Sequence, residues 1–102
     1  MVAPAPKPTI DPVAIAALCQ RHGVTRLALF GSVLRDDFGP HSDVDVLVEF
    51  AGGKSPSLFT LGGMQQELTG MFGRVADLKT PGFLSRYFRD EVRAGSRVLY
   101  GR

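Results

Sequence analysis

Apolar and polar positions follow one another along the chain in short blocks with two different periods. The segment from Asp11 to Gly23 carries apolar side chains at helical spacing, with a capping aspartate and a proline at its start and a glycine at its end. Residues 25–30 then form a short apolar run that ends at Gly31, which is typical of a buried strand. These two blocks predict a helix followed by a strand.

The later blocks predict five further elements. Three valines alternate with other residues over 43–50, so this predicted strand has one apolar face. Residues 58–72 show a helical pattern that three glycines interrupt, 74–80 indicate a strand, 83–93 an amphipathic helix and 97–100 a last short strand. The order of helix, two strands, helix, strand, helix and strand predicts an α+β fold, in which helices pack against a small mixed sheet.

The length of 102 residues fits one small domain, since domains run from roughly 50 to 200 residues. Four of the first twelve residues are prolines, so we expect a flexible tail over residues 1–9 and one domain over residues 10–102.

No signal-peptide core is present, and no apolar run approaches the roughly 20 residues that span a bilayer. We therefore expect no membrane partner and a cytoplasmic protein, in which the single Cys19 is a small buried apolar group.

The charge of the chain is nearly balanced. Its net value is only +2, from 12 lysines and arginines against 10 aspartates and glutamates, so we expect no direct binding of nucleic acid. Residues 74–102 are more basic, with seven basic and three acidic side chains. This region suits either a phosphate or acidic partner, or simply a solvated helix face.

Two aspartates in one predicted strand carry the first chemical signal. Aspartate is disfavoured in strands, and Asp43 and Asp45 point to the same face with carboxylates close enough to repel. A divalent cation would compensate the pair, and carboxylate oxygens suit Mg²⁺, which completes its shell with waters and substrate phosphates. Taken alone, the pair fits equally well a charged strand edge that blocks aggregation.

The turn that follows the first strand adds phosphate donors. Gly31 lets the backbone approach a ligand closely, and Ser32 presents a hydroxyl and an N–H. Ten residues separate this turn from Asp43, which places donors and metal ligands at the same end of two neighbouring strands.

Asp77 lies in a later predicted strand. If that strand lies beside the one with Asp45, Asp77 can bind a second ion or take a proton from an attacking hydroxyl; alone it would be a cap or a surface charge.

A resemblance to a known family is carried by the segment LFGSVLRDDFGPHSDVDVLVEF. It resembles the minimal nucleotidyltransferase family of the polymerase beta superfamily, whose motif is Gly-Ser, ten residues and Asp-x-Asp, with a third carboxylate on a later strand. The resemblance implies the polymerase beta-like fold, two Mg²⁺ ions, a nucleoside triphosphate, and transfer of a nucleoside monophosphate onto a hydroxyl. It assigns the phosphate-binding turn to Gly31 and Ser32, the metal ligands to Asp43 and Asp45, and the third catalytic and metal-binding acid to Asp77.

One part of the family motif differs in this chain. Many members carry Arg-x-Arg-Gly after the Gly-Ser turn, whereas here the residues are VLRD, so only Arg35 remains of the two arginines. Arg35 is either a nucleotide-binding residue or a surface arginine paired with Asp36 or Asp37.

The resemblance also implies a substrate and a partner. ATP is the expected nucleotide. Stand-alone members of this size are commonly antitoxins paired with an all-helical HEPN-type ribonuclease toxin, which some of them neutralise by adding AMP to a tyrosine. The alternative is a catalytically silent antitoxin that binds through exposed apolar positions of residues 58–72 and basic residues of the last helix. Transfer to a small molecule ranks last, because relatives with that activity carry an additional domain.

Overall fold

The helices and strands follow one another in the order that the sequence predicts. The computed structural model describes residues 8–35, 38–39, 41–53, 56–84 and 86–101. Within these ranges the elements are α1 (Pro12–His22), β1 (Val24–Phe30), β2 (Val44–Phe50), α2 (Leu58–Phe72), β3 (Ala76–Lys79), α3 (Arg86–Gly95) and β4 (Arg97–Tyr100). Short 3-10 turns are η1 (Gly31–Leu34), η2 (Ala51–Gly53) and η3 (Pro81–Phe83).

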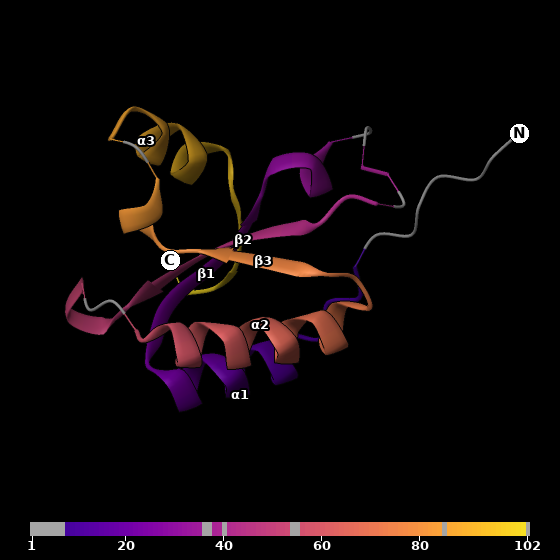
Figure 1. The fold of residues 1–102 in the computed structure, drawn as a ribbon, viewed down its shortest axis with the longest axis vertical. Helices are drawn as coiled ribbons and strands as arrows, with labels where there is room; N and C mark the ends of the chain where they lie inside the picture. Colours follow the sequence, from indigo (N-terminus) through magenta and orange to yellow (C-terminus); the bar gives the residue numbers. More distant parts are fainter. Residues whose placement is uncertain (1–7, 36–37, 40, 54–55, 85, 102) are drawn as a thin grey trace, which may run out of the picture.

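The strands form one mixed sheet in the order β3-β2-β1-β4. β1 pairs antiparallel with both β2 and β4, whereas β2 and β3 run parallel. α1 and α2 lie together on one side of the sheet, and α3 lies on the other (Figure 1). This arrangement confirms the predicted α+β fold.

The first two helices begin and end at residues suited to capping. Asp11 caps α1 by accepting hydrogen bonds from the N–H groups of Val13 and Ala14 at 3.1 and 3.3 Å, and Gly23 ends the helix with φ 70°. α2 runs without a break through its three glycines, so the predicted interruption is wrong. One side of α2 is buried against the sheet, and this burial outweighs the low helix propensity of glycine.

The boundaries of the later elements differ by a few residues from the prediction. Asp43 lies just before β2, and β3 is shorter than the predicted strand over 74–80. The guanidinium of Arg74 binds a neighbouring loop, and Pro81 begins η3, so the chain leaves the sheet at both ends of β3. Because η3 takes up part of the helix predicted over 83–93, α3 begins and ends later along the chain.

The core lies between the sheet and the pair of helices α1 and α2. Its members come from one side of each helix and from alternate positions of the strands, and they include Ile15, Leu18, Cys19, Leu27, Leu29, Val44, Val46, Val48, Met64, Leu68, Phe72 and Ala76. Cys19 is buried, as predicted, and its burial raises the pKa of the thiol to about 11.

The start of the chain contacts α2. Residues 1–7 of the predicted tail lie outside the described residues, but the N–H of Thr9 donates a hydrogen bond to the carbonyl of Phe72 at 3.1 Å. Within the described ranges, none of the helices is both long and apolar enough to cross a bilayer.

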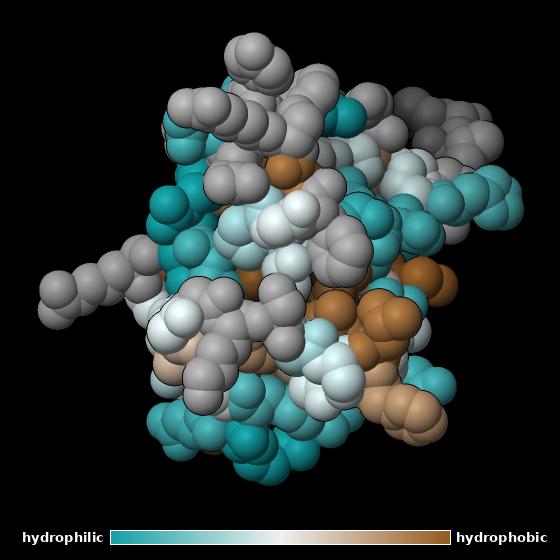
Figure 2. Space-filling view, turned by 60° about the vertical axis from the view of Figure 1, so that its left-hand side comes forward, coloured by the Kyte–Doolittle hydropathy of each residue, from teal (hydrophilic) through white to brown (hydrophobic). Residues whose placement is uncertain are grey.

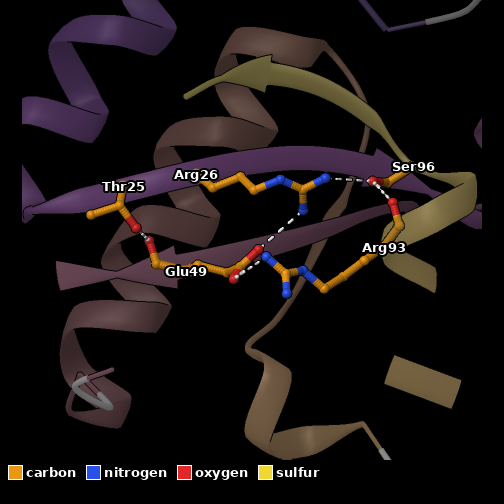
Figure 3. Close-up of polar contacts among 5 residues, drawn as sticks. All are labelled: Thr25, Arg26, Glu49, Arg93 and Ser96. Carbon is orange, nitrogen blue, oxygen red and sulfur yellow. Dashed lines mark hydrogen bonds and ion pairs between the residues drawn. The ribbon is translucent and has the colours of Figure 1, made fainter. Parts of the chain in front are cut away.

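Charged side chains hold α3 against the sheet face opposite the core (Figure 3). Arg26 of β1 and Arg93 of α3 form ion pairs with the two carboxylate oxygens of Glu49, at 3.0 and 3.2 Å. Arg26 also donates a hydrogen bond to Oγ of Ser96 at 3.0 Å. The Glu49 side chain is only 19% exposed, so this network is partly shielded from solvent and connects the C-terminal segment to β1 and β2.

Candidate active site

The acidic residues meet where β2 and β3 begin. In the parallel pairing of these strands Asp45 lies directly opposite Asp77, and on its other side Asp45 faces Phe30, the last residue of β1. The residues on either side of each aspartate are buried in the core, so strand alternation directs both carboxylates to the opposite face of the sheet. The structure therefore brings together Asp45 and Asp77, which are 32 positions apart in the sequence.

Gly31 brings the Gly-Ser turn against the carboxylate of Asp45. Its backbone is left-handed, with φ 77°, a conformation that favours glycine. A Cβ built on Gly31 would lie 3.3 Å from Cγ of Asp45 and would collide with Oδ2. Only glycine fits here without a shift of the carboxylate, and the half-buried Ser32 follows it in η1.

Burial and the two neighbouring acids change the pKa of Asp45. Burial raises its pKa most, and the negative charges of Asp77 and Asp43 raise it further. The positive charges of Lys79 and Arg35 act in the opposite direction. A cation bound at Asp45 would offset the repulsion from Asp77 and Asp43.

The donor set fits a hard divalent cation. Asp43 is exposed, whereas Asp45 and Asp77 are half-buried. Among the described residues, no group of three or more His, Cys, Asp or Glu side chains is arranged to hold a metal ion, so the protein alone supplies no complete cage. Mg²⁺ does not require one, because it is usually bound through one or two carboxylates, waters and substrate phosphates.

Arg74 holds the loop that leads to Asp43, a role that the sequence analysis missed. Its Nη2 donates hydrogen bonds to the carbonyl oxygens of Gly39 and Ser42 at 2.7 and 2.8 Å. Its guanidinium also lies over the ring of the buried Phe38, 4.4 Å from the centroid. No spacing in the sequence links an isolated arginine after α2 to a loop 32 residues earlier, so pattern alone could not find this contact.

Arg35 follows η1 and is exposed. With Arg97 it contributes to the lining of a pocket of about 310 Å³. Asp36 and Asp37, the alternative partners considered for Arg35, lie outside the described residues. The positive charge of Arg35 lowers the pKa of Asp45.

Comparison with known proteins identifies the family. The sequence profile of the nucleotidyltransferase domain family matches residues 13–99, which contain all the residues of the site. The chain belongs to the nucleotidyltransferase domain family. This nucleotidyltransferase is 35% identical over 78 residues to a candidate protein adenylyltransferase of Methanocaldococcus jannaschii, and the match covers 76% of this chain and 82% of that protein.

Solved structures show the same fold. A candidate minimal nucleotidyltransferase superposes on this nucleotidyltransferase with a TM-score of 0.69 at 32% identity, over 83% of this chain and 85% of the other. A chain from the complex of a tri-AMPylated Shewanella oneidensis HEPN toxin with an MNT antitoxin superposes with a TM-score of 0.64 at 20% identity, over 89% and 70% of the two chains. These matches confirm the predicted minimal nucleotidyltransferase fold. They also confirm the prediction that the protein is a nucleotidyltransferase.

Proposed function

We propose that this nucleotidyltransferase transfers AMP from ATP to a hydroxyl group of a protein partner, with Mg²⁺ as cofactor. The observation that carries the proposal is the direct pairing of Asp45 with Asp77, against a turn whose Gly31 has no room for a side chain. This arrangement brings two acids and the backbone of the Gly-Ser turn together at one edge of the sheet. The reaction is expected to take place in the cytoplasm.

Each residue of the site has a proposed role. Asp43 and Asp45 would hold Mg²⁺, with Asp77 as a further ligand for a second ion, and the metal would neutralise charge on the triphosphate. Gly31 and Ser32 bind the β and γ phosphates through backbone and hydroxyl donors, and Arg35 adds a positive charge. The acceptor oxygen then attacks the α phosphorus, its proton passes to Asp77, and the bond to pyrophosphate breaks.

The proposed acceptor is a tyrosine of an all-helical HEPN-type toxin, which makes this nucleotidyltransferase an antitoxin. Support comes from the complex of AMPylated HEPN toxin and MNT antitoxin, whose matched chain shares the fold, and from the name of the Methanocaldococcus jannaschii relative. The matched region of this chain comprises little beyond the sheet and its helices, so a macromolecular acceptor must dock on the outside of the domain.

Incubation with α-labelled ATP, Mg²⁺ and the candidate toxin tests the proposal. We expect the native protein to transfer label to the toxin, and Asp45→Asn or Asp77→Asn to lose at least about a hundredfold in rate, because general base and charge-stabilising groups each contribute that much. Circular dichroism confirms that the variants fold. Equal transfer by the native protein and by both variants would exclude these acids from the reaction.

A second candidate function is neutralisation by contact alone. It is favoured by the apolar surface of α2, where Leu58 and Phe59 are 79% and 95% exposed. Apolar side chains also gather in a brown area of the surface in Figure 2. An Asp43→Asn/Asp45→Asn variant that still neutralises the toxin fully, with no label on the toxin in any sample, would establish this function in place of AMP transfer.

A further inference from the structure

A lysine lies beside the acidic pair on the same face of the sheet. Lys79 follows Asp77 by two residues in β3, so strand alternation directs both side chains away from the core. Its Nζ lies 3.4 Å from Oδ2 of Asp77. The same charge acts on the carboxyl group of Asp45, whose pKa it lowers against the rise caused by burial. Lys79 is therefore a counter-ion for Asp77, which lies directly opposite Asp45.

Two arginines on this face have a different partner. Arg26 and Arg93 both bind Glu49, at the far end of β2 from Asp45, as Figure 3 shows. The ammonium of Lys79 instead forms its ion pair with an acid of the site. The Lys79 and Asp77 side chains are 41% and 38% exposed, and ion pairs so open to solvent contribute little to stability. The pair can thus be broken at small cost when a ligand arrives.

We propose that Lys79 is a positioning residue: its ammonium pairs with Asp77 beside Asp45 in the free protein and moves to a phosphate oxygen of the nucleoside triphosphate in the substrate complex. This inference rests on the proposed function, because it assumes that the acidic pair receives a cation together with the nucleotide. A lysine has three donors on a flexible stem, which allows it to exchange a carboxylate for a phosphate as its partner.

The physical consequence is that binding of the cation and binding of the nucleotide become coupled. A divalent cation that approaches Asp45 and Asp77 alone meets the repulsion of the Lys79 ammonium. A triphosphate removes this repulsion, since its oxygens attract the ammonium and supply further ligands to the cation. The free protein should therefore bind the metal weakly, and the nucleotide should strengthen that binding.

Manganese binding, read by electron paramagnetic resonance, tests this inference without any measurement of activity. Mn²⁺ is titrated into the native protein, Lys79→Met and Lys79→Arg, first alone and then with a non-hydrolysable ATP analogue. Without nucleotide, Lys79→Met should bind Mn²⁺ about threefold to tenfold more tightly than the native protein, because one positive charge near the ligands is gone. With Mn²⁺ present, it should bind the analogue more weakly by a similar factor.

Lys79→Arg keeps the charge and should behave like the native protein. Arg21→Met is the matched control, because it removes one positive charge from an exposed ion pair with Glu67, on α1 and α2, without contact to the site. Unchanged or weaker Mn²⁺ binding by Lys79→Met would overturn the inference. If Asp45→Asn binds Mn²⁺ as tightly as the native protein in the presence of the analogue, the metal site itself is wrong, and the proposed function fails with it.

Discussion

At the scale of single residues, Gly31 brings the Gly-Ser turn against the acidic pair. A side chain at this position needs a left-handed backbone and collides with Asp45. We expect Gly31→Ala to lose about 1–2 kcal/mol of unfolding free energy from the backbone conformation, and to displace the carboxylate of Asp45. Its rate of AMP transfer should fall at least tenfold. Urea unfolding and the labelled-ATP assay measure the two effects.

Gly23 provides the matched control for this substitution. Its φ of 70° is nearly that of Gly31, but no heavy atom lies within 4 Å of a Cβ built on it. Gly23→Ala should lose a similar amount of stability from its backbone and keep the native rate of transfer. Native transfer by Gly31→Ala would show that the contact with Asp45 does not matter for the reaction.

The charge of Asp45 lowers the stability of the fold. Its pKa in the folded protein is raised above the ordinary value of 3.8, so the folded state holds this proton more tightly than the unfolded state. The stability of the native protein therefore falls as the pH rises through the interval between these two values. At neutral pH, Asp45→Asn should be more stable by up to about 1 kcal/mol, because it removes a partly buried charge that also repels Asp77 and Asp43.

Thermal melts of both proteins in metal-free buffer from pH 3 to pH 8 measure this difference. The two curves should converge at the acid end, where the native carboxyl is protonated and resembles the amide. A lower melting temperature of Asp45→Asn at neutral pH would contradict the argument.

At the scale of elements, the contacts of a loop decide where Asp43 lies. Arg74 binds the carbonyl groups of Gly39 and Ser42 and covers the ring of Phe38. Arg74→Met removes charge-assisted hydrogen bonds, and we expect it to lose about 2–3 kcal/mol of unfolding free energy and most of its transfer activity. Arg74→Lys should be intermediate, since an ammonium lacks the planar fork.

Urea unfolding and transfer kinetics are again the measurements for Arg74, with Arg21→Met as the comparison. Arg21 forms an exposed ion pair with Glu67, so its loss should cost no more than about 1 kcal/mol and leave transfer unchanged. If the two variants behave alike, Arg74 does not order the loop.

The order of elements could be predicted because each has a local signal. The valines that alternate over 44–48 and the capping aspartate of α1 act within a few residues, and their predictions hold. The unbroken α2 could not be predicted, because its glycines are compensated by burial against the sheet. The late start of β3 depends on distant contacts of Arg74, which no local pattern records.

At the scale of the whole molecule, the sequence motif predicts one part of the candidate site, and the pairing of the strands adds the other. The spacing from Gly31 to Asp43 indicated the two strand ends, but the pairing of Asp45 with Asp77 is a property of the sheet. Lys79 had no signal of its own, because a basic residue in a basic C-terminal third does not stand out. Its contact with Asp77 becomes visible only when the alternation of β3 is set against the register with β2.

Most of the buried apolar side chains lie in the layer between the sheet and α1 with α2, and the two sides of α2 test how much this layer contributes to stability. Leu68 is fully buried in that layer, and Leu68→Ala should lose about 2–5 kcal/mol of unfolding free energy. Phe59, on the same helix, is 95% exposed, and Phe59→Ser should change the unfolding free energy by less than about 0.5 kcal/mol. Urea unfolding compares the two. A loss above 1 kcal/mol for Phe59→Ser would mean that this ring is covered within the isolated chain, which would remove the apolar surface of α2 as a docking site for a partner.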